Sequence, residues 1–262
     1  MTESVGYLPE KGKRFVMKNS PKLNVLMFLV LGLAACQESG SDGDAQAAGE
    51  PEQSASARFD RAMSKRGCEL LSAELVAATF AVPADALTQF KIMGCRYSWE
   101  GDEQTLDAGI SMIRAYDREA GAASWFATAT RSRTAEEVQA EMDELAGRLD
   151  KSEQLDTELK KSTAKGLLDT VDAKAVAFED VAGVGDEARV SDDGTVYVRV
   201  DNLTFMVSAY KGPAAPSPDF QGADIQQMAA IAKENAAQWA IETAPQRKAD
   251  GVRLARAIVD AL

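Results

Sequence analysis

Residues 195–210, TVYVRVDNLTFMVSAY, carry the strongest strand signal in the chain. Two runs rich in β-branched and aromatic residues are separated by Asp201-Asn202, a pair suited to a tight hairpin turn. Side chains alternate along a strand, so the first run has two faces: Val196, Val198 and Val200 on one, Tyr197 and Arg199 on the other. This stretch predicts an antiparallel hairpin with one buried face, as in a sheet covered by helices on one side.

Weaker strand signals flank this hairpin in both directions. Residues 175–178 and 187–190 precede it as short strands, with a turn at 192–194. Further upstream, residues 92–101 and 105–116 indicate two strands joined by a loop near Gly101 and Asp102. Helical patterns lie on either side of these runs. The order of elements predicts an α+β fold built on an antiparallel meander.

Four helical regions complete the pattern. Residues 68–83 have apolar residues at helical spacing until Pro83 ends the run, and Asp117 begins a helix containing Trp125 and Phe126. A long helical block over 134–168 opens with a capping box between Thr134 and Glu137. After a Pro-rich loop at 211–219, two helices are expected to close the chain. Their apolar faces are Ile225, Met228, Ala232 and Trp239, then Val252, Ala255, Val259 and Leu262.

The long block has a narrow apolar seam formed by Val138, Met142, Leu145 and Leu149. Polar residues at 152 and 156 interrupt it, which argues against a sustained coiled coil. Two interpretations remain open: a surface helix that covers an edge of the core, or an arm that docks a partner.

The N-terminus has the parts of a secretory signal. Five Lys or Arg residues precede an apolar run over 23–35, which is shorter than the about 20 residues that span a bilayer. The tetrapeptide LAAC at 33–36 resembles the lipobox of bacterial lipoproteins. That resemblance implies cleavage before Cys36 and acylation of Cys36, so that acyl chains bind the lipid bilayer. Gln37, where an aspartate would favour retention at the inner membrane, indicates the outer membrane, with the domain facing the periplasm.

Two other interpretations of this leader stay open: a cleaved signal with an incidental cysteine, and an uncleaved signal anchor. Residues 1–35 are expected to be the signal peptide. Met17-Lys18 also resembles a natural start, and with that start residues 1–16 would come from a misassigned initiation codon. Residues 36–57 are small and polar, which predicts a flexible tether. Residues 58–262 are expected to form a single α+β domain.

Charge excludes one class of partner. Residues 1–35 hold five of the 29 basic and two of the 41 acidic residues, which leaves 24 against 39 and a net charge of −15. Nucleic-acid affinity depends mainly on cationic contacts with phosphates, so we expect no nucleic acid partner.

Cysteine usage indicates an exported protein. With Cys36 acylated, Cys68 and Cys95 remain as an even pair in an oxidising compartment and predict one disulfide. The alternative is two free buried thiols.

Motifs with catalytic associations are weak. The sequence GVGDEA at 183–188 fits a dinucleotide pattern but runs into a turn where a helix is required. Two S-x-x-K matches lack their companion motifs. Histidine is absent from the chain. We therefore expect no catalytic residue, metal or cofactor.

Two groups of residues leave binding open. Acidic residues gather in two loops, at Glu100, Asp102, Glu103 and Asp107 and at Asp186, Glu187, Asp192 and Asp193, where solvated loops are favoured over weak calcium sites. Five aromatic residues provide either core or the lining of an apolar pocket: Trp99, Trp125, Phe126, Tyr210 and Trp239.

The segments CELLSAELVAATF, CRYSW and VAGVGDEARV, with GTVYVRVDNLTFMVSAY, resemble small bacterial lipoproteins of unknown function built on a PsbP-like α/β/α sandwich. The long block at 134–168 departs from that fold. The resemblance implies a non-catalytic role in binding an envelope protein or a small apolar ligand. The competing function is an exported hydrolase that uses carboxylates for acid–base chemistry.

Overall fold

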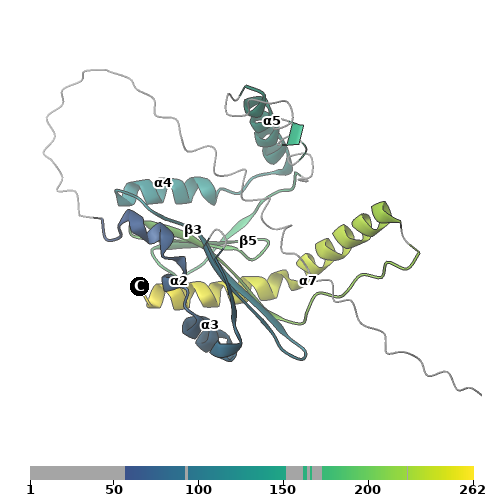
Figure 1. Cartoon of the computed structure of the whole chain (residues 1–262). Helices are drawn as coiled ribbons and strands as arrows, with labels where there is room; N and C mark the ends of the chain where they lie inside the picture. The colour runs from purple at the N-terminus through teal and green to yellow at the C-terminus, as the bar shows by residue number, and fades with distance from the viewer. Residues whose placement is uncertain (1–56, 92–93, 152–161, 164–165, 167–172, 223) are drawn as a thin grey trace, which may run out of the picture. The chain divides into compact units, whose positions relative to one another are not determined.

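The computed structural model describes residues 57–91, 94–151, 162–163, 166, 173–222 and 224–262 (Figure 1). The chain divides into two units. One comprises Asp44–Asp143 and Ala173–Leu262, and the other comprises Met1–Gly43 and Glu144–Asp172. The described strands all belong to the first unit, which is the subject of the following paragraphs.

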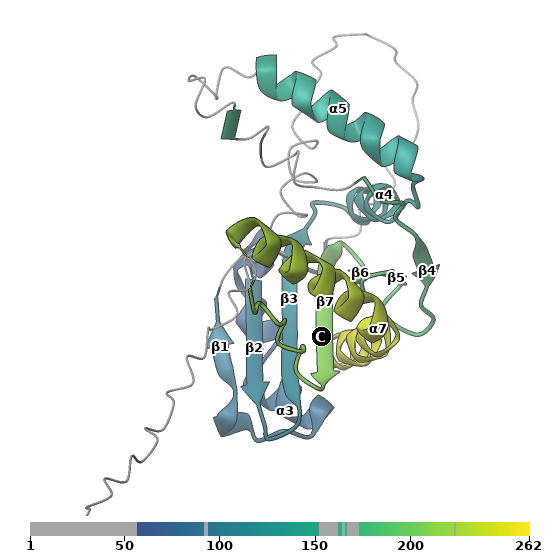
Figure 2. The same cartoon turned by 90° about the vertical axis from the view of Figure 1, so that its right-hand side faces the viewer.

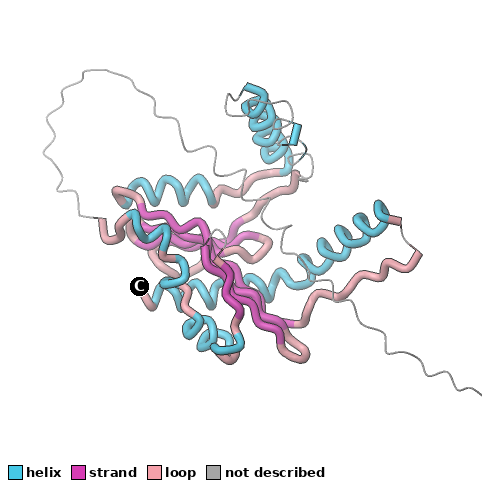
Figure 3. The backbone as a smooth tube through the Cα atoms, viewed as in Figure 1, coloured by secondary structure: helices cyan, strands magenta, loops and turns pink. Residues whose placement is uncertain are grey.

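Seven antiparallel strands form one sheet (Figure 3), in the order β1-β2-β3-β7-β6-β5-β4 (Figure 2). The strands are β1 (Thr88–Phe90), β2 (Gly94–Glu100), β3 (Thr105–Ala115), β4 (Phe178–Asp180), β5 (Glu187–Ser191), β6 (Val196–Val200) and β7 (Leu203–Gly212). The α+β class and the antiparallel meander are therefore confirmed. Both edge strands have only three residues, which limits pairing with other chains.

The β6–β7 hairpin forms as the sequence predicts. Val196 pairs with Val207 and Val200 with Leu203, and Asp201 in the turn has a φ of 55°. The strand predicted at 175–178 lies further along the chain in the structure, where β4 begins at Phe178. Before it, Val176 makes only an isolated bridge to Arg133.

The main core lies on the valine face of β6. The C-terminal half of α7 (Ile225–Asp260) covers this face with Leu254, Ala255 and Ile258, all buried. They pack in one cluster with Phe205 and Val207 of β7, and the same cluster includes residues of α3 (Ala73–Phe80). Figure 1 shows α7 and α3 on one side of the strands. Burial of this apolar surface is the main stabilising contribution to the fold.

The opposite face of the sheet is covered at β6, so the expectation of an exposed face was wrong there, while the same face stays partly exposed at Arg96 of β2 and Asp107 of β3. Helix α4 (Glu119–Ala129) lies against β6 and β7 with Ala122 and Phe126 buried. Tyr197 and Arg199 of β6 are only 7% and 8% exposed as a result. The alternating side chains of residues 196–200 predicted the strand correctly. They could not show that α4, which is distant in sequence, covers the second face of that strand.

The first helical region is two helices. α2 (Gly67–Leu70) follows the 3₁₀ turn η3 (Arg61–Lys65), and α3 begins after Ser72. Ser72 has extended backbone and its Oγ accepts a hydrogen bond from Leu75 N at 3.2 Å. A serine that caps a helix in this way also ends the preceding one, because the extended conformation interrupts the helical hydrogen bonds. A second 3₁₀ turn, η4 (Ala84–Ala86), leads into β1.

Of two other predicted helix starts, that of α5 is confirmed and that of α4 is displaced by one residue. α5 (Ala135–Lys151) begins after Thr134, whose Oγ1 accepts from Glu137 N at 3.2 Å while Glu137 accepts from Thr134 N at 2.8 Å. That predicted capping box is confirmed. α4 begins after Arg118, because the Asp117 carboxylate pairs with Arg61.

The long block is helical over α5, and its seam residues Val138, Met142, Leu145 and Leu149 are half-buried. Most of the rest of the predicted block, 152–168, lies outside the described residues. The docking role of this block stays a prediction.

A single helix, α7, replaces the two predicted at the C-terminus. It has 36 residues, is capped by Asp224 and Gln227, and contains Pro245. Its ribbon changes direction along its length in both views (Figures 1 and 2), as expected where proline removes a helical hydrogen bond. The N-terminal half buries little: Ile225 is 81% exposed, although the sequence pattern placed it on an apolar face.

Polar contacts attach α7 and α3 to the sheet. Asp250 of α7 is fully buried, and its Oδ2 accepts hydrogen bonds from Lys211 N at 2.8 Å and Gln246 Nε2 at 3.0 Å. Lys211 Nζ donates to Phe80 O at 2.6 Å. The other carboxylate oxygen of Asp250, Oδ1, has no hydrogen bond and lies 3.7 Å from Arg253 Nη2. The bonds to Lys211 and from Lys211 fix the two helices in register with β7.

Candidate functional site

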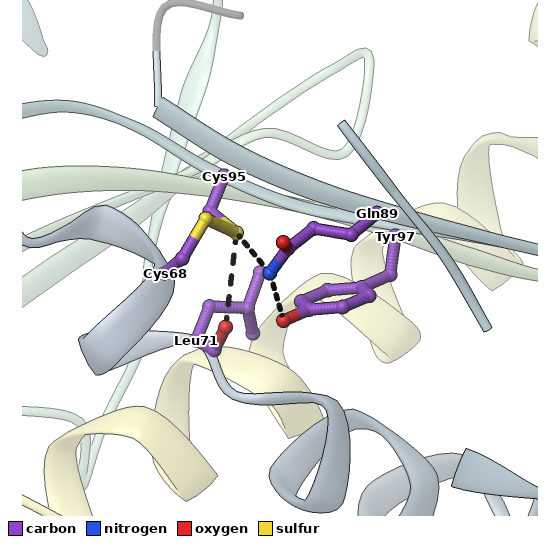
Figure 4. The surroundings of a disulfide bond; sticks show 5 residues. All are labelled: Cys68, Leu71, Gln89, Cys95 and Tyr97. Carbon is purple, nitrogen blue, oxygen red and sulfur yellow. Dashed lines mark hydrogen bonds between the residues drawn. A yellow bond between two sulfur atoms is a disulfide. The ribbon is translucent and has the colours of Figure 1, made fainter. Parts of the chain in front are cut away.

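The predicted disulfide joins Cys68 of α2 to Cys95 of β2 (Figure 4). Cys95 is 1% exposed, and the bond lies beside Gln89, whose Nε2 donates to Tyr97 Oη at 2.6 Å. The bond closes a loop with a sequence separation of 27 and ties the N-terminal helices to the sheet. The pairing of Cys68 with Cys95 is confirmed.

The predicted lipid attachment site, Cys36, lies outside the described residues. Acylation of this cysteine stays a prediction. Within the described part of the chain, no helix has the length and hydropathy needed to cross a membrane.

A surface hollow forms where the N-terminal segment meets the β6–β7 turn. Asn202 is fully buried in that turn, and its Nδ2 donates to Phe59 O at 2.7 Å and to Tyr116 O at 2.6 Å. Its Oδ1 accepts from Phe59 N at 2.9 Å. One amide side chain in the β6–β7 turn therefore holds the segment before η3 beside the end of β3. These three segments are far apart in sequence.

The hollow has a volume of about 340 Å³ and is lined by Arg61, Ser64, Arg114, Ala115, Tyr116 and Asp117. Arg61 pairs with Asp117 through both carboxylate oxygens, at 3.0 Å from Nε and 2.6 Å from Nη2. These hydrogen bonds and the charge of Arg61 lower the pKa of the Asp117 carboxyl, with a smaller contribution from the charge of Arg118. The pair is largely exposed, so its contribution to stability is small.

The second arginine of the hollow stacks on an aromatic ring. The Arg114 guanidinium lies 4.8 Å from the centroid of the Tyr116 ring, a cation–π geometry. A bulge in β3 immediately precedes Arg114, and bulges commonly redirect side chains at functional sites. Burial raises the pKa of Tyr116, and the charge of Arg114 acts in the opposite direction. Arg114 makes no ion pair with any carboxylate in the described part of the chain.

Two hydroxyls behind Arg114 are buried and make no hydrogen bond of good geometry. They are Tyr116 Oη and Oγ1 of Thr204, the residue that pairs with Arg114 across the sheet. The Thr204 hydroxyl also interacts with Tyr116 and lowers the pKa of Tyr116 slightly. Both oxygens are closed to solvent, so they are not part of the surface of the hollow.

Arg199, which does not line the hollow, is buried on the α4 side of the sheet. Arg199 contacts Glu187 at 3.0 Å, Glu119 at 3.1 Å and Asp186 at 3.4 Å, and its side chain is 9% exposed. Asp186 and Glu187 belong to the GVGDEA segment, which forms the turn between β4 and β5 and leads into a strand. This agrees with the predicted turn. The interactions cross-link β5, β6 and α4.

The second acidic group is divided between separate roles. Asp186 and Glu187 bind Arg199, Asp193 Oδ1 accepts from Thr195 N at 3.0 Å, and Asp192 lies 3.5 Å from Lys248 Nζ. In the first group, Asp107 pairs with Arg96. No set of three potential metal ligands gathers anywhere in the described residues.

The five aromatic residues do not line one pocket. Tyr210 and Trp239 form an edge-to-face pair at 5.9 Å between ring centroids. Trp99 packs against the core cluster and Phe126 is buried in α4. A second hollow of about 380 Å³ is lined mainly by polar residues around Arg189 and includes Phe178 but none of the five.

No protein-family model, curated protein or solved structure matches this chain.

The arginine-lined hollow was not found from the sequence. Its residues come from 61–64 and 114–117 and meet only because Asn202 connects these segments. The available signal was the series of basic residues at Arg58, Arg61, Lys65 and Arg66, which is unusual in a chain so rich in acids.

Proposed function

We propose that this protein is a bacterial envelope lipoprotein. Acyl chains on Cys36 hold it at a membrane, proposed to be the outer membrane, and its domain faces the periplasm and binds a partner without catalysing a reaction. The proposed fold family is the PsbP-like α/β/α sandwich, with the helical block at 134–168 as an addition. The partner is either another envelope protein or a small ligand.

The disulfide is the observation that best supports this proposal. Structural disulfides form in oxidising compartments and are rare in the cytosol. The Cys68–Cys95 bond lies against the core, where it stabilises the domain. Export to such a compartment agrees with the basic and apolar leader and with the lipobox ending at Cys36.

Two surface features support a binding role. The hollow beside Arg61 and Arg114 is preorganised by buried hydrogen bonds of Asn202. On α7, Ile225 and Ile241 are 81% and 70% exposed on a half-helix whose other residues are mostly exposed. The two side chains lie on different faces of α7, about 160° apart, so each marks a separate exposed apolar position.

The hydrolase alternative is less well supported. A general acid that works near neutral pH needs a raised carboxyl pKa. The carboxyl pKa values that shift in the described residues are all lowered, those of Glu74, Asp117, Glu136 and Glu137. The largest convergence of acids, around Arg199, neutralises a buried cation and leaves no acid positioned toward an apolar cleft.

A cysteine variant tests the membrane anchor. Cys36→Ser removes the acceptor of the acyl chains, and Ser39→Ala is a matched control three residues away. We expect the Cys36→Ser protein to keep its leader and to incorporate no radiolabelled fatty acid, and the control to be cleaved and labelled as the parent is. Equal labelling and cleavage in all three proteins would contradict the proposal.

The binding role can be tested by site-specific photocross-linking in intact cells. A photoreactive residue at Ile241 should give a discrete cross-linked species, and the same residue at Ala236, an exposed position about 140° around α7 from Ile241, should give much less. Identical patterns from both positions would argue against a partner on this helix.

A further inference from the structure

The hollow beside η3 has an excess of positive charge. Two arginines, Arg61 and Arg114, line it together with one carboxylate, Asp117. Arg61 neutralises Asp117 through a two-point ion pair, while Arg114 has no ion-pair partner in the described residues. The net charge of the lining residues is +1, in a chain that carries −12 in total.

The geometry of the hollow suits an oxyanion. The guanidinium of Arg114 is held by the Tyr116 ring at 4.8 Å, so part of its rotational freedom is lost before a ligand arrives. Arginine presents paired N–H donors that match the oxygens of a phosphate group. The volume of about 340 Å³ accommodates a phosphate together with part of the group that carries it.

From these observations we infer that the hollow formed by Arg61, Arg114 and Tyr116 is a binding site for a phosphate group. The ligand is either a soluble phosphate compound or the phosphate of a lipid headgroup. Arg114 and the free N–H groups of Arg61 donate to the phosphate oxygens. Because Arg61 and Asp117 are 79% and 69% exposed, the affinity is modest and decreases with added salt.

The headgroup source deepens the proposed function and rests on it. The first described residues of the domain, 57–61, lead directly into the hollow, and the predicted tether joins them to Cys36. An acyl anchor at that end would hold the hollow at a high effective concentration of headgroups. Basic side chains near an anionic bilayer each add to the attraction.

Titration of the detergent-solubilised full chain with inorganic phosphate at low salt tests the site. We expect saturable binding that Arg114→Gln weakens about tenfold, because a charge-assisted contact is lost. Arg148→Gln removes the same charge from an exposed position on α5 and should leave the affinity unchanged. Asp117→Asn should strengthen binding about threefold, because it removes the competing carboxylate and frees Arg61.

The opposite results would overturn the inference. These are the absence of saturable binding, an equal loss in Arg148→Gln and Arg114→Gln, or weaker binding in Asp117→Asn. Thermal unfolding of each variant separates loss of the site from loss of the fold.

A vesicle experiment distinguishes the two sources of phosphate. The mature chain, residues 36–262 carrying Cys36→Ser, lacks both the basic leader and the acyl chains, and it is mixed with phosphatidylcholine vesicles with and without phosphatidylglycerol. If the headgroup is the ligand, phosphatidylglycerol increases binding and Arg114→Gln abolishes the increase. Phosphate binding without that increase would overturn the lipid source and assign the hollow to a soluble compound. The phosphate titration does not involve Cys36, so its outcome is independent of the lipid anchor.

Discussion

Removal of the disulfide should destabilise the domain by an amount that follows from its loop length. The variant carries Cys68→Ala and Cys95→Ala together, so that no free thiol remains. Cross-linking residues separated by 27 positions restricts the unfolded chain, and the chain-entropy relation gives about 3.5 kcal/mol at 25 °C for such a loop. Loss of buried sulfur at Cys95, which is 1% exposed, adds a small cavity cost.

For a domain of this size, each kcal/mol corresponds to a shift of about 2–4 °C in the melting temperature. The double variant should therefore melt about 7–14 °C below the parent protein. Calorimetry or circular dichroism measures the shift. The matched control is the parent protein with and without a phosphine reductant, since reduction opens the loop and keeps both sulfur atoms. Melting temperatures within about 2 °C of each other for oxidised parent, reduced parent and variant would refute this reasoning.

Two further predictions concern the α4 side of the sheet. Arg199→Met should lower the free energy of unfolding by about 3 kcal/mol, because loss of the buried guanidinium leaves three carboxylates without their cation. The control, Arg96→Met, removes a half-exposed ion pair and should lower it by about 1 kcal/mol or less. Equal losses for the two variants in urea titrations would contradict the role given to burial. Burial raises the pKa of Tyr197 from 10.0 to about 12, so the neutral hydroxyl stabilises the fold below pH 10 and that stability is lost as the pH rises toward 12. About 2.7 kcal/mol should disappear over this window in the parent but not in Tyr197→Phe, and parallel pH profiles of the two proteins would be inconsistent with that assignment.

Local signals predicted much of the fold. The β6–β7 hairpin follows from its turn and its β-branched residues, and the α5 start follows from the reciprocal bonds of Thr134 and Glu137. The disulfide partners followed by elimination once Cys36 was assigned to the lipid. Each of these inferences depends on a few neighbouring residues or on a count.

Features that depend on distant contacts could not be predicted. The burial of Arg199 requires α4, and the alternation of β6 is the same whether or not a helix covers its second face. The continuity of α7 through Pro245 was missed because proline usually ends or kinks a helix. Here the helix continues through Pro245 and changes direction along its length (Figures 1 and 2).

The candidate site shows the same limit. Arg61 and Arg114 are ordinary surface residues in the sequence, separated by 52 intervening positions. They line one hollow because the buried amide of Asn202 binds the backbones of Phe59 and Tyr116. The sequence indicated a turn at Asn202 but contained no signal for this second role.

The lipid anchor is the claim on which the proposed function depends most directly. Intact-mass measurement of the protein extracted from membranes tests it without any variant. We expect a polypeptide that begins at Cys36, carries the added mass of acyl chains on that residue and retains the Cys68–Cys95 bond. A protein that keeps residues before Cys36 and has an unmodified thiol there would contradict it.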